Sequence, residues 1–180
     1  MARIMRMALT LTSGISWVFA GATAAHAEER TSAASGEATV QLQVTHSGKC
    51  LDIDHAKTDN GIKAQQWTCN GTVAQQWRMV PVDNSSFELR SIASGKCLEV
   101  ENSGTQEGAD VQQWRCSGGK QMRWRTVLVD AGRDLFEIRP THTDNRCLDI
   151  DRAMMENGVR AQQWGCNQSE AQLWQITPVK

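Results

Sequence analysis

Hydrophobic and polar residues alternate in three short segments of the chain, and a cysteine follows closely after each segment. The apolar positions in these segments are Val40, Leu42 and Val44, then Phe87 and Leu89, then Phe136 and Ile138. A period of two residues is typical of a strand that buries one face. No window holds a sustained 3.6-residue pattern, so the sequence predicts an all-β protein.

One sequence segment, which includes such a cysteine, occurs three times along the chain. The stretches 47–77, 94–124 and 144–174, here called repeats 1, 2 and 3, share the order C-L-[DE]-[IV], then Q-Q-W-x-C, then a second Trp. Gly61, Gly108 and Gly158 occupy the same place in each repeat and predict a turn. A unit of this size cannot close its own core, so the three repeats must pack together. Three equal units are too few for a propeller, which needs about four blades, and favour a pseudo-threefold axis.

Composition and charge narrow the function classes. The chain has 180 residues, of which 40% are hydrophobic and 22% charged, with a formal net charge of −1. This is the composition of a soluble globular protein. A nearly neutral chain offers no electrostatic argument for nucleic acid or an anionic membrane as a partner.

The first 27 residues predict export. Arg3 and Arg6 precede an uncharged apolar stretch, 7–20, and Ala25 and Ala27 supply the small residues of a cleavage site. This pattern indicates a signal peptide over 1–27 and a secreted product. The alternatives are a membrane anchor or a core helix, although the stretch is short for a membrane span. Residues 28–37 are small and polar and predict a flexible leader before the domain at 38–180.

The repeated motifs resemble a known family. Three copies of C-L-[DE]-[IV], of Q-Q-W-x-C and of a Q-x-W-like ending are similar to ricin B-type lectin domains, and more narrowly to the bacterial carbohydrate-binding modules of that group. The resemblance covers about 38–180. It implies a β-trefoil with four strands per repeat, a sugar site on each repeat, no catalysis, no cofactor and no metal.

The six cysteines have two symmetric pairings under a threefold repeat. They can pair within each repeat, or each second cysteine can pair with the first cysteine of the next repeat, which would join Cys166 to Cys50. Pairing within repeats is more local, and the resemblance agrees with it. The expected disulfides are then Cys50–Cys69, Cys97–Cys116 and Cys147–Cys166. Each such loop stabilises by about 3 kcal/mol; reduced, packed thiols are the alternative.

An acid and an indole recur together in each repeat. If Leu51 faces the core, Asp52 lies on the opposite, solvent face of the strand. A carboxylate accepts hydrogen bonds from sugar hydroxyls, and an indole offers a flat platform for the C–H face of a sugar ring. The alternatives are a solvated acidic strand face and core tryptophans. With the resemblance, the predicted carbohydrate-binding residues are Asp52, Gln65, Trp67, Asn70 and Gln75 in repeat 1, and Asp149, Gln162, Trp164, Asn167 and Gln172 in repeat 3.

Other positions depart from this pattern. The second tryptophans, Trp77, Trp124 and Trp174, are expected in the core. The family often has Asn before the Gln of Q-x-W, but here Ala74 and Ala171 stand there and cannot donate a hydrogen bond. In repeat 2 the corresponding residue is Gln121, Glu99 replaces Asp, and Met122 replaces Gln, so Glu99 and Trp114 form the weakest predicted site.

The sequence therefore predicts a secreted lectin whose partners are glycans, with galactose-type sugars and xylan as the classes that the resemblance suggests. A glycosidase based on Asp52 and Asp54 is disfavoured because this acidic pair recurs in all three repeats. The alternative is a protein-binding trefoil, an inhibitor or toxin subunit with degenerate sugar sites, whose partner is another secreted protein.

Overall fold

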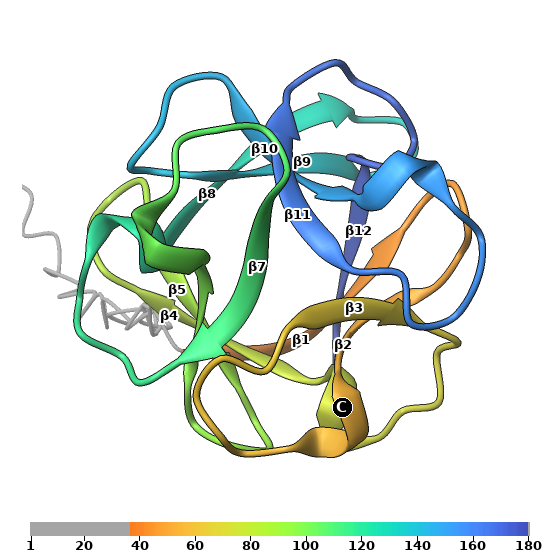
Figure 1. The fold of residues 1–180 in the computed structure, drawn as a ribbon. Coiled ribbons are helices and arrows are strands. Elements are labelled where there is room, and N and C mark those ends of the chain that lie inside the picture. Colours follow the sequence, from red (N-terminus) through yellow and green to blue (C-terminus); the bar gives the residue numbers. More distant parts are fainter. Residues whose placement is uncertain (1–36, 180) are drawn as a thin grey trace, which may run out of the picture. The chain divides into compact units, whose positions relative to one another are not determined.

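The computed structural model describes residues 37–179 and contains twelve strands in that part of the chain (Figure 1). Each repeat has four of them once it is extended to include the strands that flank it, so that repeats 1, 2 and 3 span 38–81, 87–130 and 135–178. The strands are β1 (Ala38–Val44), β2 (Cys50–Ile53), β3 (Ala64–Trp67), β4 (Trp77–Pro81), β5 (Phe87–Ser91), β6 (Cys97–Val100), β7 (Ala109–Trp114), β8 (Arg123–Asp130), β9 (Leu135–Pro140), β10 (Arg146–Ile150), β11 (Ala161–Gly165) and β12 (Trp174–Pro178). The predicted signal peptide and the leader through residue 36 lie outside the described residues.

Five single turns of 3₁₀ helix complete the secondary structure of residues 37–179. They are η1 (Asp54–Ala56), η2 (Val73–Gln75), η3 (Glu101–Ser103), η4 (Lys120–Met122) and η5 (Asp151–Ala153). Three of them follow the strand that carries the acidic residue, and two precede the second Trp. In this described part, no helix is long and apolar enough to cross a membrane.

The first and fourth strands of the three repeats close into a six-stranded barrel. Antiparallel pairing runs β1–β4, β4–β5, β5–β8, β8–β9 and β9–β12, and β12 pairs with β1 from Val40↔Pro178 to Val44↔Trp174. The second and third strands of each repeat form hairpins. In Figure 1, β3, β7 and β11 surround the centre of the view. The prediction of an all-β trefoil with pseudo-threefold symmetry is confirmed.

Three fully buried tryptophans belong to the hydrophobic core. Trp77, Trp124 and Trp174 stand at or near the start of β4, β8 and β12, and none of them is exposed (0%). Their indole N–H groups donate to the carbonyl oxygens of Leu51 at 3.2 Å, Leu98 at 2.9 Å and Leu148 at 3.1 Å. A buried indole N–H requires a partner, and each repeat supplies it from its own second strand. The expectation that these tryptophans are core residues is confirmed.

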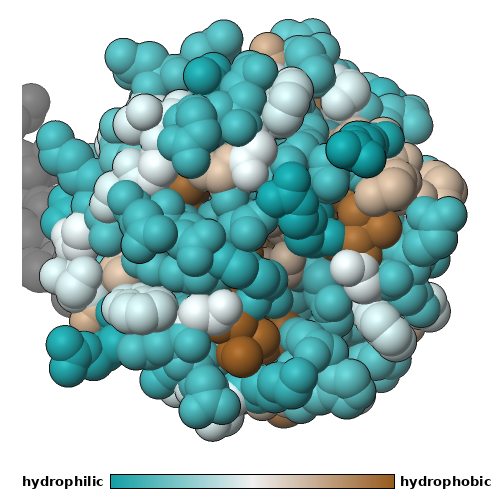
Figure 2. All heavy atoms as spheres, viewed as in Figure 1, coloured by the Kyte–Doolittle hydropathy of each residue, from teal (hydrophilic) through white to brown (hydrophobic). Residues whose placement is uncertain are grey.

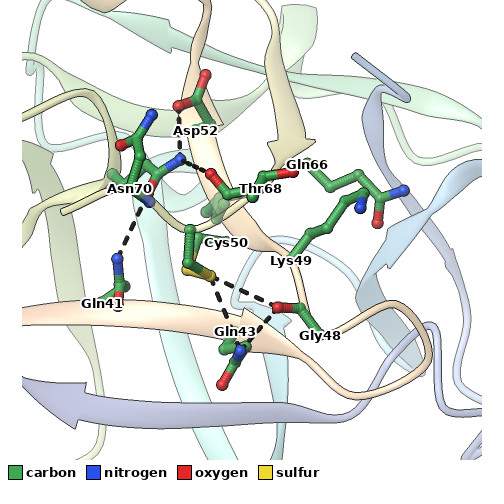
Figure 3. Close-up of a disulfide and its surroundings, with 12 residues drawn as sticks. Gln41, Gln43, Gly48, Lys49, Cys50, Asp52, Gln66, Thr68 and Asn70 are labelled. Atoms are coloured by element: carbon green, nitrogen blue, oxygen red, sulfur yellow. Dashed lines mark hydrogen bonds between the residues drawn. A yellow bond between two sulfur atoms is a disulfide. The ribbon is translucent and has the colours of Figure 1, made fainter. Parts of the chain in front are cut away.

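The disulfides join cysteines within each repeat. Cys50–Cys69, Cys97–Cys116 and Cys147–Cys166 each have a Cα–Cα distance of 5.1 Å, so the pairing between repeats is excluded. Figure 3 shows the first of them beside Gln43, whose Nε2 donates to the carbonyl of Gly48 at 2.7 Å. Each bond ties the second strand to the segment just after the third strand and thus fixes both sides of one hairpin.

Polar side chains dominate the face of the trefoil that Figure 2 shows. On the face shown in Figure 2 the colour is mostly that of hydrophilic residues, and the hydrophobic spots are small and separate. Single exposed apolar residues are normal on a folded protein. The three tryptophans of β3, β7 and β11 are among the exposed large hydrophobic side chains.

Replacing a core indole and an exposed indole should have different effects on stability. Trp174→Ala should lower the free energy of unfolding by about 3–5 kcal/mol, because it leaves a large cavity and an unpaired carbonyl. Trp164→Ala should cost clearly less, because part of that ring already faces solvent. Urea denaturation of both variants measures the difference, and equal losses would contradict the division into core and surface tryptophans.

Candidate functional site

Three pockets, one in each repeat, lie over the hairpins. We call them site 1, site 2 and site 3, with volumes of about 310, 230 and 420 Å³ respectively. Each pocket is lined by the acid of the second strand, by the glutamine and tryptophan of the third strand, and by residues from the following loop. These shared residues are Asp52, Gln65 and Trp67 in site 1, Glu99, Gln112 and Trp114 in site 2, and Asp149, Gln162 and Trp164 in site 3.

The acidic side chains are buried at the pocket floor, which corrects the expectation that Asp52 lies on a solvent face. Asp52 is 4% exposed and Asp149 6% exposed. Strand alternation does place Asp52 opposite the core side chains, but glutamines cover that second face. The Asp52 carboxylate accepts from Gln65 Nε2 at 2.9 Å and from Gln75 Nε2 at 3.1 Å. The outer face of β2 is therefore the floor of a pocket, where Asp52 is covered by glutamines and not open to solvent.

Site 3 repeats this arrangement atom for atom. Asp149 accepts from Gln162 Nε2 at 2.8 Å and from Gln172 Nε2 at 3.0 Å. One amide binds each carboxylate oxygen in both sites, which leaves each oxygen with a further lone pair for a ligand. The two sites thus present the same rigid acceptor.

The glutamines of Q-x-W support the carboxylates from behind. Gln75 and Gln172 are not exposed (0%), although they were among the predicted binding residues. Gln75 also donates to the carbonyl of Thr68 at 3.0 Å and accepts from the Asn70 amide at 2.9 Å. The structure therefore places the Gln75 side chain where it holds Asp52 and the following loop, without reaching the pocket surface.

Burial raises the pKa of both aspartates above the ordinary value of 3.8. Loss of hydration is the largest cause for Asp52 and for Asp149. The hydrogen bonds from the paired glutamines oppose it, because they stabilise the charged form. The neighbouring acids, Asp54 and Asp151, add to the rise in pKa by repulsion.

The tryptophans beside these carboxylates are partly open to solvent. Trp67, Trp114 and Trp164 are 37%, 42% and 39% exposed, whereas the second tryptophan of every repeat is fully buried. The alternative that they are core residues is therefore excluded. An aromatic ring that borders a pocket and keeps part of its surface exposed is a platform for an apolar face of a ligand.

The asparagines after the second cysteines line the same two pockets. Asn70 Oδ1 accepts from the amide and hydroxyl of Thr72, and Asn167 Oδ1 accepts from the amide of Ser169. The side-chain oxygen is thus occupied within the loop, and the NH₂ group remains as a donor. Ala74 and Ala171 also line these pockets and provide space there without a polar group.

Site 2 differs in the way its acid is held. Glu99 accepts from Gln112 Nε2 at 3.0 Å, but Met122 takes the place of the second glutamine. The Met122 thioether lies 3.4 Å from the Ser117 amide and cannot donate to the carboxylate. Gln121 replaces the small alanine at the pocket wall, and the volume of site 2 is the lowest of the three.

Residues at the rim distinguish the sites, and sequence reasoning did not identify them. His55, Asn102 and Arg152 occupy equivalent positions with φ of 51°, 53° and 52°, and they line sites 1, 2 and 3. Arg160 also lines site 3, where it is paired with Asp151 at 3.3 Å. Asn and His tolerate positive φ better than Arg does, so residue type alone does not unite the three positions. Only their shared place, three residues after the acid, could have indicated all of them.

Comparison with known proteins agrees with this geometry. The profile described as ricin-type beta-trefoil lectin domain-like matches residues 16–114 and, in a second match, 80–164. The chain belongs to the ricin-type β-trefoil lectin domain-like family. No curated protein matches the chain.

Solved structures resemble this member of the ricin-type family over most of its length. The designed threefold symmetric protein ThreeFoil is 33% identical, with a TM-score of 0.74, over 78% of this chain and 99% of the other. An exo-β-1,3-galactanase from Clostridium thermocellum is 28% identical, with a TM-score of 0.74, over 79% of this chain but only 30% of the enzyme. A ricin B-like lectin from Macrolepiota procera, in complex with lactose, shares the fold at 20% identity and a TM-score of 0.67, over 77% of this chain and 94% of the lectin.

The two hydrogen bonds from Gln65 and Gln75 act as a clamp on the Asp52 carboxylate. The part of Gln75 can be tested by giving repeat 1 the methionine that repeat 2 has at this position. Gln75→Met should raise the pKa of Asp52 further above 3.8, because it removes a hydrogen bond that favours the carboxylate. Unfolding should become easier by about 1–3 kcal/mol, since buried groups lose partners. NMR titration of the carboxyl carbons measures the pKa, and Asp149 is the internal control whose pKa should not change. An unchanged pKa of Asp52 would contradict the clamp.

Proposed function

We propose that the protein is a secreted lectin that binds glycans without cleaving them, through site 1 and site 3. The observation that carries this proposal is the pairing of a buried, twice-bound carboxylate with a partly exposed indole in each of two pockets. Site 2 keeps the indole but lacks the second amide on its acid, and we expect it to be silent.

The two groups match the two kinds of surface on a sugar ring. The carboxylate accepts hydrogen bonds from adjacent hydroxyls, and charged acceptors form the stronger kind of hydrogen bond. The indole of Trp67 or Trp164 packs against the C–H face. Asn70 and Asn167 supply a donor at the pocket wall. Because the pockets are shallow and the contacts few, a single sugar should bind at about millimolar concentration.

Galactose-type and xylan-type glycans are the proposed ligand classes. The galactose class is supported by the galactanase and by the lactose-bound lectin among the similar structures. The two sites belong to different repeats about the pseudo-threefold axis, so a branched or polymeric glycan can engage both. Simultaneous binding raises the apparent affinity well above that of either site.

Secretion is part of the proposal. Residues 1–27 would be the signal peptide, 28–37 a leader, and 38–180 the lectin domain. Three disulfides support an oxidising compartment, because such bonds rarely persist in the cytosol. Amino-terminal sequencing of the exported protein tests it: a start at Glu28 is expected.

Substitution of the acids tests the number of sites. Asp52→Ala and Asp149→Ala should each halve the stoichiometry of monosaccharide binding, and the double variant should abolish binding. Glu99→Ala is the matched control and should change little, because site 2 is expected to be silent. Isothermal titration with monosaccharide and polysaccharide, guided by a glycan array, gives the stoichiometries. If the double variant binds sugar at full strength, the carboxylate assignment is wrong and a protein-binding trefoil becomes the better hypothesis.

Acid should weaken sugar binding earlier than an ordinary aspartate would allow. Because burial holds the pKa of Asp52 and Asp149 above 3.8, protonation removes the charged acceptor as the pH falls through these raised values. The same raised pKa has the opposite sign for folding: its contribution to stability is present at low pH and is lost as the pH rises through the folded pKa. Titrations between pH 7 and about 3.5 should therefore show affinity lost while the fold persists. An affinity that stays constant down to pH 3.8 would contradict this.

A further inference from the structure

The turn of one repeat lies against the site tryptophan of another repeat. A Cβ placed on Gly158 of repeat 3 would lie 3.9 Å from Cζ3 of Trp67 in repeat 1. The other two interfaces repeat this arrangement, since a Cβ placed on Gly61 would lie 3.6 Å from Cζ3 of Trp114, and one placed on Gly108 would lie 3.7 Å from Cζ3 of Trp164. These three glycines have φ of +85°, +83° and +79°, a conformation that side chains rarely adopt.

The residue before each glycine binds the main chain just after the tryptophan. Asn157 Oδ1 accepts from the amide of Thr68 at 2.9 Å and from its hydroxyl at 3.1 Å. In the equivalent contacts, Asn60 Oδ1 accepts from the Arg115 amide at 3.0 Å and Glu107 Oε1 from the Gly165 amide at 3.2 Å. The ring of each tryptophan and the main chain just after it thus lie beside the same turn of another repeat.

The residue before each tryptophan completes the attachment. Gln66 Nε2 donates to the carbonyls of Met154 at 2.7 Å and Glu156 at 2.8 Å. The main chains also exchange bonds, from the Gly158 amide to the Gln66 carbonyl at 2.9 Å and from the Gln66 amide to the Val159 carbonyl at 2.8 Å. Gln113 and Gln163 make the same pair of side-chain bonds to the turns of repeats 1 and 2.

We propose that each indole platform is positioned by the turn of a neighbouring repeat, so that every sugar site is built from two repeats. Site 1 takes its acid and indole from repeat 1 but its support from Asn157 and Gly158 of repeat 3. Site 3 takes its support from Glu107 and Gly108 of repeat 2. These turn residues are positioning residues, since none of them lines a pocket. The inference rests on the proposed function for its sugar readout only.

The physical reason is the exposure of the ring. More than a third of Trp67 faces solvent, so its own repeat surrounds it only in part. Stacking on a sugar face depends on the orientation of the ring. Any side chain at Gly158 is strained because φ is +85°, and a single methyl group would already reach ordinary contact distance from Gln65 Oε1 and from the Trp67 ring. A branched side chain adds further bulk at the same place. Either response, a shifted turn or a displaced ring, changes the platform.

The decisive test uses two matched valine substitutions in single-site proteins. Asp149→Ala leaves only site 1, and Asp52→Ala leaves only site 3. Gly158→Val should weaken monosaccharide binding about tenfold or more at site 1, although it lies in repeat 3, and should not affect site 3. Gly108→Val should weaken site 3 to the same extent and should not affect site 1. The two glycines have similar φ, +85° and +79°, and a Cβ added to them would lie 3.9 and 3.7 Å from the ring, so each controls for the strain of the other.

Milder variants keep the test valid if valine prevents folding. Asn157→Ala and Glu107→Ala each remove the side-chain hydrogen bond from the turn to the main chain after the tryptophan. Asn157→Ala should weaken monosaccharide binding at site 1, and Glu107→Ala at site 3, by about two- to tenfold. The proposal is overturned if a turn variant weakens the site of its own repeat, weakens both sites equally, or weakens neither.

A spectroscopic readout separates this inference from the proposed function. The indole Nε1–H resonance of Trp67, assigned with Trp67→Phe, should shift in Gly158→Val and stay in place in Gly108→Val, with no sugar present. If no glycan binds the unsubstituted protein, the proposed function fails, and this shift still decides the positioning role. Absence of the shift in Gly158→Val overturns the inference.

Discussion

The bond from a buried indole N–H to a leucine carbonyl connects the core of each repeat to its pocket. Trp77 is buried in the core and donates to the carbonyl of Leu51, the residue directly before Asp52. Gln75, two positions before Trp77, binds the Asp52 carboxylate. The Q-x-W motif therefore has two roles. Its tryptophan holds the main chain of β2 through Leu51, and its glutamine holds the side chain of Asp52 on the same strand.

Repeat 2 differs from the other two repeats in the residue that reaches the pocket and not in the tryptophan of the core. Repeat 2 keeps Trp124 and its bond to Leu98, and its barrel strands pair like those of the other repeats. With Met122 in place of a glutamine, Glu99 nevertheless lacks the second amide and is held by Gln112 alone. Trp124 thus keeps the core of repeat 2 as in the other repeats, while Met122, only two positions before it, changes how the acid of the pocket is held.

Most of the fold could be predicted from the sequence because its determinants are local or repeated. The period of two in β1, the spacing of Cys50 and Cys69, and the recurrence of Trp77 each restrict the structure directly. The burial of Asp52 could not be predicted in this way. Alternation shows which face a side chain takes, but what covers that face comes from glutamines 13 and 23 residues away.

Contacts between repeats were beyond the same reasoning for a related cause. Gly158 is recognisable as a turn residue, and its positive φ agrees with that prediction. Nothing in its neighbourhood along the chain indicates that the turn meets Trp67, which lies in another repeat. The rim residues His55 and Arg152 were missed because the repeats share no residue type at this position, and only its place three residues after the acid connects them.

Closure of the barrel through β1 and β12 has a consequence for connectivity. The pairing from Val40↔Pro178 to Val44↔Trp174, extended by the bond from the Val179 amide to the Thr39 carbonyl at 2.9 Å, is equivalent to the pairings inside the chain. The strand pairs of the barrel therefore do not depend on which strand comes first in the chain. A circularly permuted chain, with Thr39 and Val179 bridged by a linker and new ends between β4 and β5, would contain the same set of strand pairs. The linear order of the three repeats is thus a property of the gene and not of the architecture.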